Sequence, residues 1–289
     1  MAETRKPDLR ALVADELGQP VDPRVAAMAA AIAAKHGSAA RAVLFYGSCL
    51  RQVQLDGLML DFYLIVSSYR AAYGRGWLAA ANRLVPPNVF YFEADGLAAK
   101  YAVLSEADFR RLNGPETSNV SVWARFAQPA RLAWAADAGA REAAVEAVAR
   151  AAPTLLGAAG RREGEAMLDW WRRAFALTYS AELRAERKGR AASVVDSEPE
   201  RYLRFGEAAA PLVAANAGGW AARRLAGKAL SVVRLAKASA TFAGGPDYIA
   251  WKINRHAGTR IALKPWQRRW PLLAALSLLP KLLRSGAIR

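Results

Sequence analysis

The stretch FYGSCLRQVQLDGLMLDFYLIV, from Phe45 to Val66, places two apolar runs on either side of a short polar loop. The first run ends at Gly47 and Ser48, and the second, Leu58 to Val66, contains a single acidic residue, Asp61. Apolar runs of this length separated by turn residues predict two adjacent β-strands, paired as a hairpin or as neighbours in one sheet. An ionised carboxylate within an apolar strand is costly unless it meets a cation, so Asp61 is a candidate functional residue.

Other elements follow from the same kind of pattern. The Ala-rich stretch from Pro23 to His36 is stopped by Gly37 and predicts a helix. From Ala136 onward, apolar residues recur every three or four positions, which predicts a helical unit. The first apolar run predicts the strand Ala42–Tyr46, and further predicted strands are Asn88–Phe92 and Tyr101–Leu104, the latter closing a small mixed sheet near Trp134. The remaining predicted helices are Ala140–Ala151 and Gly164–Arg187.

Composition limits the class of protein and of metal site. The chain has 289 residues, of which 54% are hydrophobic, enough to fill a core and too many for a disordered protein. The net charge of +16 would attract nucleotides, nucleic acids or acidic lipids without choosing among them. One Cys and two His are too few for a disulfide framework, a structural zinc site or an iron–sulfur cluster. We therefore expect any metal to be bound by oxygen, as Mg²⁺ is.

Gly47-Ser48 and Asp61 together are typical of a nucleotidyltransferase site. A Gly-Ser at a strand end lets backbone amides and the hydroxyl bind triphosphate oxygens, and magnesium can bridge Asp61 to the nucleotide. Taken singly, Gly47-Ser48 could be an ordinary turn, and Asp61 a strand residue paired with an Arg. Enzymes resembling polymerase β carry a second acid two positions after the first, where this chain has Tyr63. The second carboxylate must therefore come from elsewhere.

Several blocks make the chain resemble a known family. Tyr46-Gly47-Ser48, Gln52 and Met59-Leu60-Asp61-Phe62 are similar to the hallmark of the phosphatidate cytidylyltransferases of the mitochondrial translocator assembly and maintenance type. These enzymes make CDP-diacylglycerol from CTP and phosphatidic acid. The resemblance touches most of the chain between Phe45 and Lys252, and its further blocks are Val89–Tyr91, Lys100–Ser105, Trp123–Pro129, Ala176–Arg184, and Thr241–Gly245 with Tyr248 and Lys252.

The resemblance implies a magnesium-dependent enzyme that transfers CMP from CTP to phosphatidic acid. Its implied catalytic residues are Asp61, Lys100 and Arg125, and its implied nucleotide-binding residues are Gly47, Ser48, Tyr179, Ser180 and Arg184. Asp61 would bind magnesium together with Glu182 or Glu93. Glu182 is preferred, although it could simply pair with an Arg on a helix face, and Glu93 could be a solvent-facing strand end.

The resemblance and the pattern together give an α+β fold with three parts. Residues 1–135 would form a polymerase-β-like nucleotidyltransferase domain with a small mixed sheet, and residues 136–205 a mainly helical domain. Residues 206–289 are basic and rich in Trp, which is typical of a segment that associates with an anionic membrane surface. The alternative is a helix packed on the protein's own core.

The longest apolar stretch, Trp270–Leu283, contains two prolines and is shorter than the roughly 20 residues that cross a bilayer, so we expect it to lie on a membrane. The amino terminus lacks the apolar run of a secretory signal. We therefore expect a cytoplasmic protein bound peripherally to the inner face of the membrane.

Two other functions fit parts of the sequence. A nucleotidyltransferase with a soluble acceptor would leave the basic, Trp-rich segment without a purpose. A non-catalytic protein that binds lipid or nucleic acid on a transferase scaffold would explain Tyr63 and the charge of +16. Nucleic acid is not an expected partner, because the sequence has no clear pattern of aromatic residues interleaved with cations on an exposed sheet.

Overall fold

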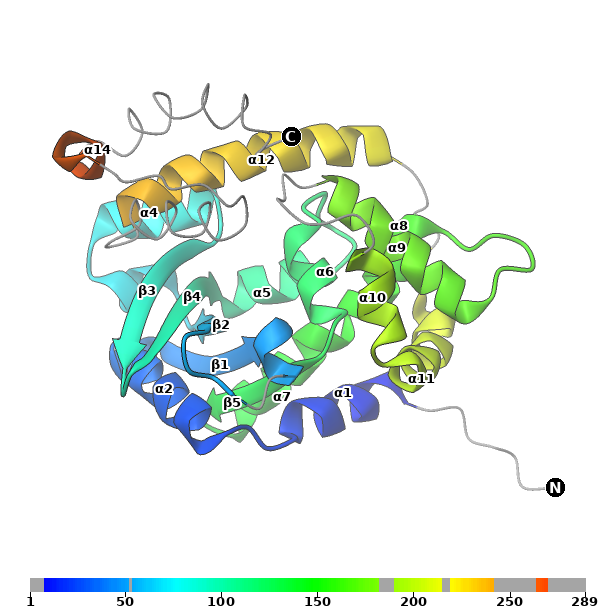
Figure 1. Ribbon diagram of the computed structural model, residues 1–289, viewed down its shortest axis with the longest axis horizontal. Coiled ribbons are helices and arrows are strands. Elements are labelled where there is room, and N and C mark those ends of the chain that lie inside the picture. Colours follow the sequence, from blue (N-terminus) through cyan, green and yellow to red (C-terminus); the bar gives the residue numbers. More distant parts are fainter. Residues whose placement is uncertain (1–7, 52–53, 182–189, 215–218, 242–263, 270–289) are drawn as a thin grey trace.

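The computed structural model describes residues 8–51, 54–181, 190–214, 219–241 and 264–269. Within them the protein is α+β with one small mixed sheet of five strands, as the sequence predicts. The strands lie in the order β3-β4-β2-β1-β5 (Figure 1). Their bounds are β1 Ala40–Tyr46, β2 Met59–Val66, β3 Asn88–Ala94, β4 Leu97–Ser105 and β5 Ala130–Ala135.

The sheet combines antiparallel and parallel neighbours. Strand β1 is antiparallel to both β2 and β5, and β3 is antiparallel to β4. Strands β2 and β4 are parallel. Two helices and β3 lie between them in the chain, which gives the long connection that parallel neighbours need. The tight β3–β4 turn uses Asp95 and Gly96 at φ of 50° and 74°, backbone angles that Asp and Gly tolerate best. The central strands β2 and β4 therefore lie side by side with their carboxyl ends at the same edge.

One face of the sheet packs on α2 (Pro23–Ala34) and α3 (Tyr69–Tyr73). Helix α2 begins with Pro23 at its first position, and the Asp22 carboxylate accepts a 2.8 Å hydrogen bond from the Arg24 amide. Its buried side chains, Val25, Met28 and Ile32, recur at helical spacing and fill the space over the strands. The predicted helix is confirmed, with its end at Ala34 rather than His36.

The other face of the sheet packs on most of the remaining helices. They share one continuous buried cluster with Leu44, Tyr63 and Leu104 of the strands. Two glycines at positive φ, Gly160 and Gly164, precede helix α9. This helix therefore begins at Met167, later than the Gly164 that the sequence pattern predicts. The helices are α1 Leu9–Gly18, α5 Glu106–Asn113, α6 Ser121–Phe126, α7 Ala138–Ala149, α8 Ala151–Ala159, α9 Met167–Ala181, α10 Arg190–Asp196 and α11 Pro199–Ala209, with short 3-10 turns at η1 Gly37–Ala39, η2 Ser48–Arg51 and η3 Ala210–Leu212.

A buried ion pair ties this helical unit to the start of the chain. Arg201 of α11 donates through Nε and Nη2 to the two carboxylate oxygens of Glu16 in α1, the latter at 2.9 Å. It also donates to the Ala127 carbonyl at 3.1 Å. The sheet and the helices after residue 135 thus share one core, and the predicted boundary at 205/206 falls inside α11.

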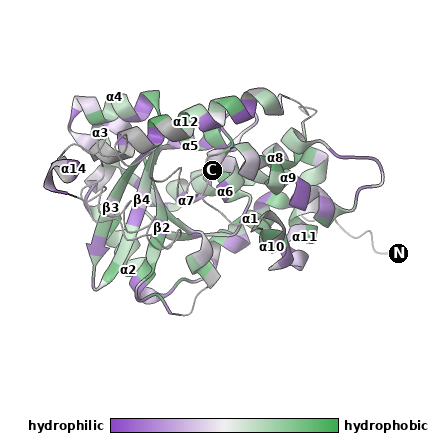
Figure 2. Ribbon diagram, turned by 45° about the horizontal axis from the view of Figure 1, so that its top comes forward, coloured by the Kyte–Doolittle hydropathy of each residue, from purple (hydrophilic) through white to green (hydrophobic). Residues whose placement is uncertain are grey.

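Helix α12 (Trp220–Thr241) extends from the helical unit toward β3, with α4 (Gly76–Leu84) beside it (Figure 1). Hydrophobic and hydrophilic residues alternate along α12 (Figure 2). The short helix α14 is Pro265–Arg269. Among the residues that the structure describes, none of the helices combines the length and apolar character needed to cross a membrane. The apolar stretch Trp270–Leu283 lies outside the described residues.

Candidate active site

Four polar side chains form a row across neighbouring strands. Tyr46 of β1 is opposite Asp61 of β2, Asp61 is opposite Lys100 of β4, and Lys100 is opposite Tyr91 of β3. Residues directly opposite each other in a sheet project from the same face. Tyr63, two residues after Asp61, is buried in the core on that face, so the polar row lies where the core ends along the strands.

Gly47 gives the Asp61 carboxylate its space. The residue has a φ of 93°, which turns the chain sharply out of β1 and into η2. A Cβ atom at this position would lie 3.3 Å from Oδ2 of Asp61, closer than most such contacts. Ser48 follows as an exposed residue at the start of η2. The predicted Gly-Ser turn and Asp61 are therefore neighbours in the folded protein.

Lys100 balances the charge of Asp61. Its Nζ lies 3.0 Å from Oδ1 of Asp61, and the two side chains are 28% and 21% exposed. The same Oδ1 atom is buried and accepts no hydrogen bond of regular geometry from the described residues, so this contact is ionic rather than a directed hydrogen bond. The structure thus brings two of the three predicted catalytic residues together, with accepting capacity remaining on the carboxylate.

Arg125 joins the cluster through Tyr46. It lies in α6, donates to the Ser121 carbonyl and interacts with the Tyr46 side chain. Burial raises the pKa of the Tyr46 hydroxyl well above its usual range, and the negative charge of Asp61 raises it further. Tyr46 consequently keeps its proton at neutral pH and can act as a hydrogen-bond donor beside Asp61.

Tyr63 occupies the position where a second acid would stand. Its ring lies 5.2 Å from that of Tyr46 and 5.1 Å from that of Phe126, measured between centroids. Its side chain is only 2% exposed. An ionised carboxylate there would be buried among aromatic rings, so this chain has packed the position with an apolar surface.

Glu93 lies away from Asp61. It is an exposed residue of β3, opposite Ala98, and its Oε2 accepts a 2.8 Å hydrogen bond from the Tyr91 hydroxyl. Strand β4 separates β3 from β2, so Glu93 stands two strands from Asp61. Within the described part of the chain, no cluster of three or more His, Cys, Asp or Glu side chains could hold a metal ion.

The predicted residues of the helical unit are only partly described. Tyr179 packs against the core near the end of α9, and the exposed Ser180 hydroxyl donates to the Leu177 carbonyl at 2.7 Å. Glu182 and Arg184 fall in 182–189, outside the described residues. The relation of these two side chains to Asp61 therefore stays a prediction.

Cys49 is packed rather than reactive. Its thiol donates a 3.5 Å hydrogen bond to the Met59 carbonyl, and the residue is 6% exposed. Burial raises the pKa of the thiol, and the charge of Asp61 raises it further. Because the thiolate is the nucleophilic form, Cys49 acts as a small residue that fills space beside the site.

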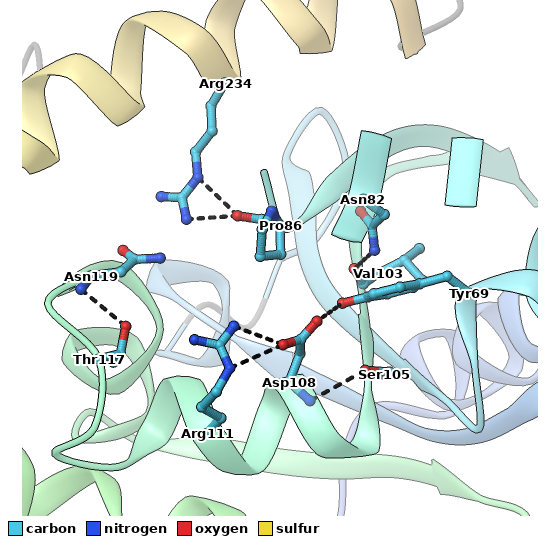
Figure 3. A network of polar contacts seen from close by, with 10 residues as sticks. All are labelled: Tyr69, Asn82, Pro86, Val103, Ser105, Asp108, Arg111, Thr117, Asn119 and Arg234. Atoms are coloured by element: carbon cyan, nitrogen blue, oxygen red, sulfur yellow. Dashed lines mark hydrogen bonds and ion pairs between the residues drawn. The ribbon is translucent and has the colours of Figure 1, made fainter. Parts of the chain in front are cut away.

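Helix α12 directs some of its cations inward, which the sequence pattern did not reveal. Arg234 donates to the Pro86 carbonyl through Nε at 3.0 Å and Nη2 at 2.7 Å, and to the Ser121 hydroxyl at 3.0 Å. Figure 3 shows Arg234 reaching from α12 toward Pro86. Lys237 donates to the carbonyls of Val85 and Pro87, the latter at 2.8 Å. Basic residues at helical spacing suit a carbonyl-rich protein surface as well as a membrane, so the sequence could not separate the two.

When the chain is compared with models of known protein families and with curated protein sequences, no match is found.

Proposed function

We propose that this protein is a nucleotidyltransferase that transfers CMP from CTP to phosphatidic acid, giving CDP-diacylglycerol and pyrophosphate at the inner face of a membrane. The observation that carries the proposal is the place of Asp61, directly beside the side-chain-free Gly47 and 3.0 Å from Lys100. The ordered family-like blocks around these residues support the choice of CTP and phosphatidic acid as substrates.

The magnesium ion expected with the nucleotide fits Asp61 as a ligand. Oδ1 of Asp61 has the Lys100 ammonium at 3.0 Å but makes no regular hydrogen bond among the described residues. Mg²⁺ commonly takes one or two carboxylates together with substrate phosphates. Asp61 would hold the ion, with Glu182 as the preferred second carboxylate. When bound, the ion supplies charge neutralisation across the triphosphate.

The chain's own residues bind and orient the triphosphate. The Ser48 hydroxyl and the amides of the turn after Gly47 would bind phosphate oxygens of CTP. Lys100 and Arg125 would neutralise the charge that develops on the phosphates, and Tyr46 would donate a hydrogen bond from its protonated hydroxyl.

The transfer is a single displacement. A phosphatidate oxygen attacks the α phosphorus in line, a new P–O bond forms, and the bond from the α phosphorus to the bridging oxygen breaks, so that pyrophosphate leaves with the electron pair. Phosphatidate is already anionic near neutral pH, so the step needs no strong general base. This agrees with a chain that has only two His.

A second candidate is a non-catalytic protein that binds acidic lipid on the same scaffold. Two observations favour it: Lys100 already neutralises Asp61, and Tyr63 fills the place of a second acid. This candidate predicts lipid binding without turnover. Transfer to a soluble acceptor would use the same site and differs only in the product.

Labelled CTP separates these candidates. Protein with Mg²⁺ and phosphatidate-containing vesicles is given CTP labelled at either the α or the γ phosphorus, with ATP, GTP and UTP as competitors. We expect the α label in the lipid fraction and the γ label in pyrophosphate. Absence of α label from the lipid would overturn the proposal, and label on an added water-soluble alcohol instead would support the soluble acceptor.

A further inference from the structure

Helix α4 is fixed to the sheet by its inward face. Asn82 is fully buried, and its Nδ2 donates to the Val103 carbonyl of β4 at 2.9 Å. Asn88, at the start of β3, donates through Nδ2 to the Leu78 carbonyl at 3.1 Å. These buried amide contacts determine which side of the short helix faces away from the protein.

The outward side of α4 is apolar. Trp77, Ala80 and Leu84 recur at i, i+3 and i+7, which places them on one face of the helix. All three are exposed, Trp77 at 54% and Leu84 at 80%, the latter the most exposed large hydrophobic side chain among the described residues. A helix on a globular protein usually turns such residues inward, so this inverted face is expected to meet something apolar.

The surroundings of this face are positively charged. Arg70, Arg75 and Arg83 are exposed, and none of them forms an ion pair with a described residue. Between Phe62 and Phe92 the chain has no Asp or Glu, although it has 25 acidic residues in all. The outward face of α4 is therefore apolar at its centre and cationic around it.

Helix α12, beside α4, also combines basic residues with exposed apolar side chains. Lys237 binds the Val85 and Pro87 carbonyls just after α4, and the two helices lie together in both views (Figures 1 and 2). No acidic residue lies between positions 208 and 246. Leu225 and Val233 of α12 are 75% and 48% exposed.

We propose that the outward face of α4 docks on an anionic lipid bilayer. Trp77 and Leu84 insert at the level of the headgroups, while Arg75 and Arg83 bind lipid phosphates. Exposed Trp and Leu ringed by Arg suit this interface, where apolar side chains bury and cations meet acidic lipid. This docking surface rests on the proposed function, because the phosphatidic acid substrate would be presented by a bilayer.

A protein partner is the less suitable occupant. A nine-residue helix is about 14 Å long. The two large apolar side chains exposed on it, Trp77 and Leu84, supply far less than the roughly 800 Å² per partner that a stable protein interface buries. Insertion into a bilayer needs only a few side chains, because neighbouring cations add attraction to the acidic surface.

Vesicle flotation with the full chain tests the surface. The vesicles are phosphatidylcholine with or without phosphatidylserine, a lipid that is not the proposed substrate. We expect Trp77→Ala with Leu84→Ala to weaken binding about tenfold or more, because two large apolar side chains are truncated. The control Leu212→Ala removes a side chain that is 60% exposed on another element and should bind like wild type. Unchanged unfolding of the double variant would exclude a folding defect.

A charge variant and a mass measurement complete the test. Arg75→Ser with Arg83→Ser should weaken binding to phosphatidylserine vesicles about fivefold per charge and leave the weak binding to pure phosphatidylcholine unaltered. The proposal is overturned if the Trp77 and Leu84 double variant floats like wild type. It is also overturned if that variant loses only self-association in sedimentation, which would make a second copy the occupant.

The proposed function and this surface can fail separately. CMP transfer is measured with phosphatidic acid in detergent micelles, where docking on a bilayer is not needed. If the Trp77 and Leu84 double variant no longer floats with vesicles but still transfers CMP in micelles, the result supports α4 as the docking surface. Flotation that depends on α4 without any CMP transfer would support the docking surface and contradict the proposed enzyme activity. CMP transfer with flotation that does not depend on α4 would support the activity and contradict the docking surface.

Discussion

Two of the ion pairs that join distant elements of this protein, Glu16–Arg201 and Asp61–Lys100, differ in how completely the chain satisfies them. Arg201 binds both oxygens of Glu16 with side chains that are 9% and 11% exposed. Nζ of Lys100 lies 3.0 Å from Oδ1 of Asp61, and these side chains are 28% and 21% exposed. The first pair is saturated by the chain itself. The second is partly exposed beside Gly47, and Oδ1 of Asp61 makes no regular hydrogen bond with a described residue, which suits a ligand site better than a structural one.

The largest effect on stability is expected at the saturated pair. Glu16→Ala leaves the Arg201 cation buried without its carboxylate, so the free energy of unfolding should fall by about 3 to 5 kcal/mol. The control is Glu142→Ala, which breaks the exposed ion pair with Arg10 and should leave the free energy of unfolding nearly unchanged. Denaturant unfolding measures both. Equal small losses would show that the Glu16 pair is not structural.

The open pair should matter for turnover instead. Lys100→Met removes the cation beside Asp61, and CMP transfer should fall about a hundredfold, since groups that stabilise transition-state charge have effects of this order. Stability should change by less than about 1 kcal/mol, because the pair is partly solvated. Steady-state assays and denaturant unfolding on one preparation test this. A large loss of stability would place Lys100 with the structural pair.

The backbone at Gly47 tests whether the Asp61 and Lys100 pair belongs to a binding site. Gly47→Ala forces an L side chain to a φ of 93° and crowds Oδ2 of Asp61, so we expect a cost of about 1 to 2 kcal/mol together with weaker CTP binding. Gly57→Ala also places a side chain at positive φ, of 72°, but its Cβ would meet nothing within 4 Å. It should lose stability without losing CTP affinity, which calorimetric titration can measure.

A further prediction concerns the pH dependence of stability. Burial, with a smaller contribution from Arg234, lowers the pKa of Lys237 to about 8 from its usual 10.5. Between these values the unfolded chain binds more protons, so this group makes stability rise as the pH rises from about 8 to 10.5. Unfolding of wild type and Lys237→Met across that range isolates the effect. Identical pH dependence would mean that Lys237 is not buried against Val85 and Pro87.

The sequence predicted the elements that carry local patterns. Apolar runs located the first four strands, and the lone acid in an apolar strand led to Asp61 beside Gly47. Lys100 came from the family-like blocks, and the strand register places it opposite Asp61. These features depend on residues close in sequence or on a motif, which is why they could be predicted.

Features that depend on distant packing could not be predicted. Glu16 and Arg201 are 185 positions apart, and no local pattern marks them as partners. The inward direction of Arg234 follows from where α12 lies, not from its composition. The separation of Glu93 from Asp61 likewise follows from the strand order, which places β4 between β3 and β2.

The most direct test of the central claim is to measure turnover and stability on the same preparation of Asp61→Asn. The amide keeps the shape of the side chain but removes the charge proposed to hold magnesium, so we expect CMP transfer to fall about a thousandfold while the free energy of unfolding changes by less than about 1 kcal/mol. Asp56→Asn, at an exposed acid five residues earlier, is the matched control. Asp61→Asn that transfers CMP at the wild-type rate would contradict the account.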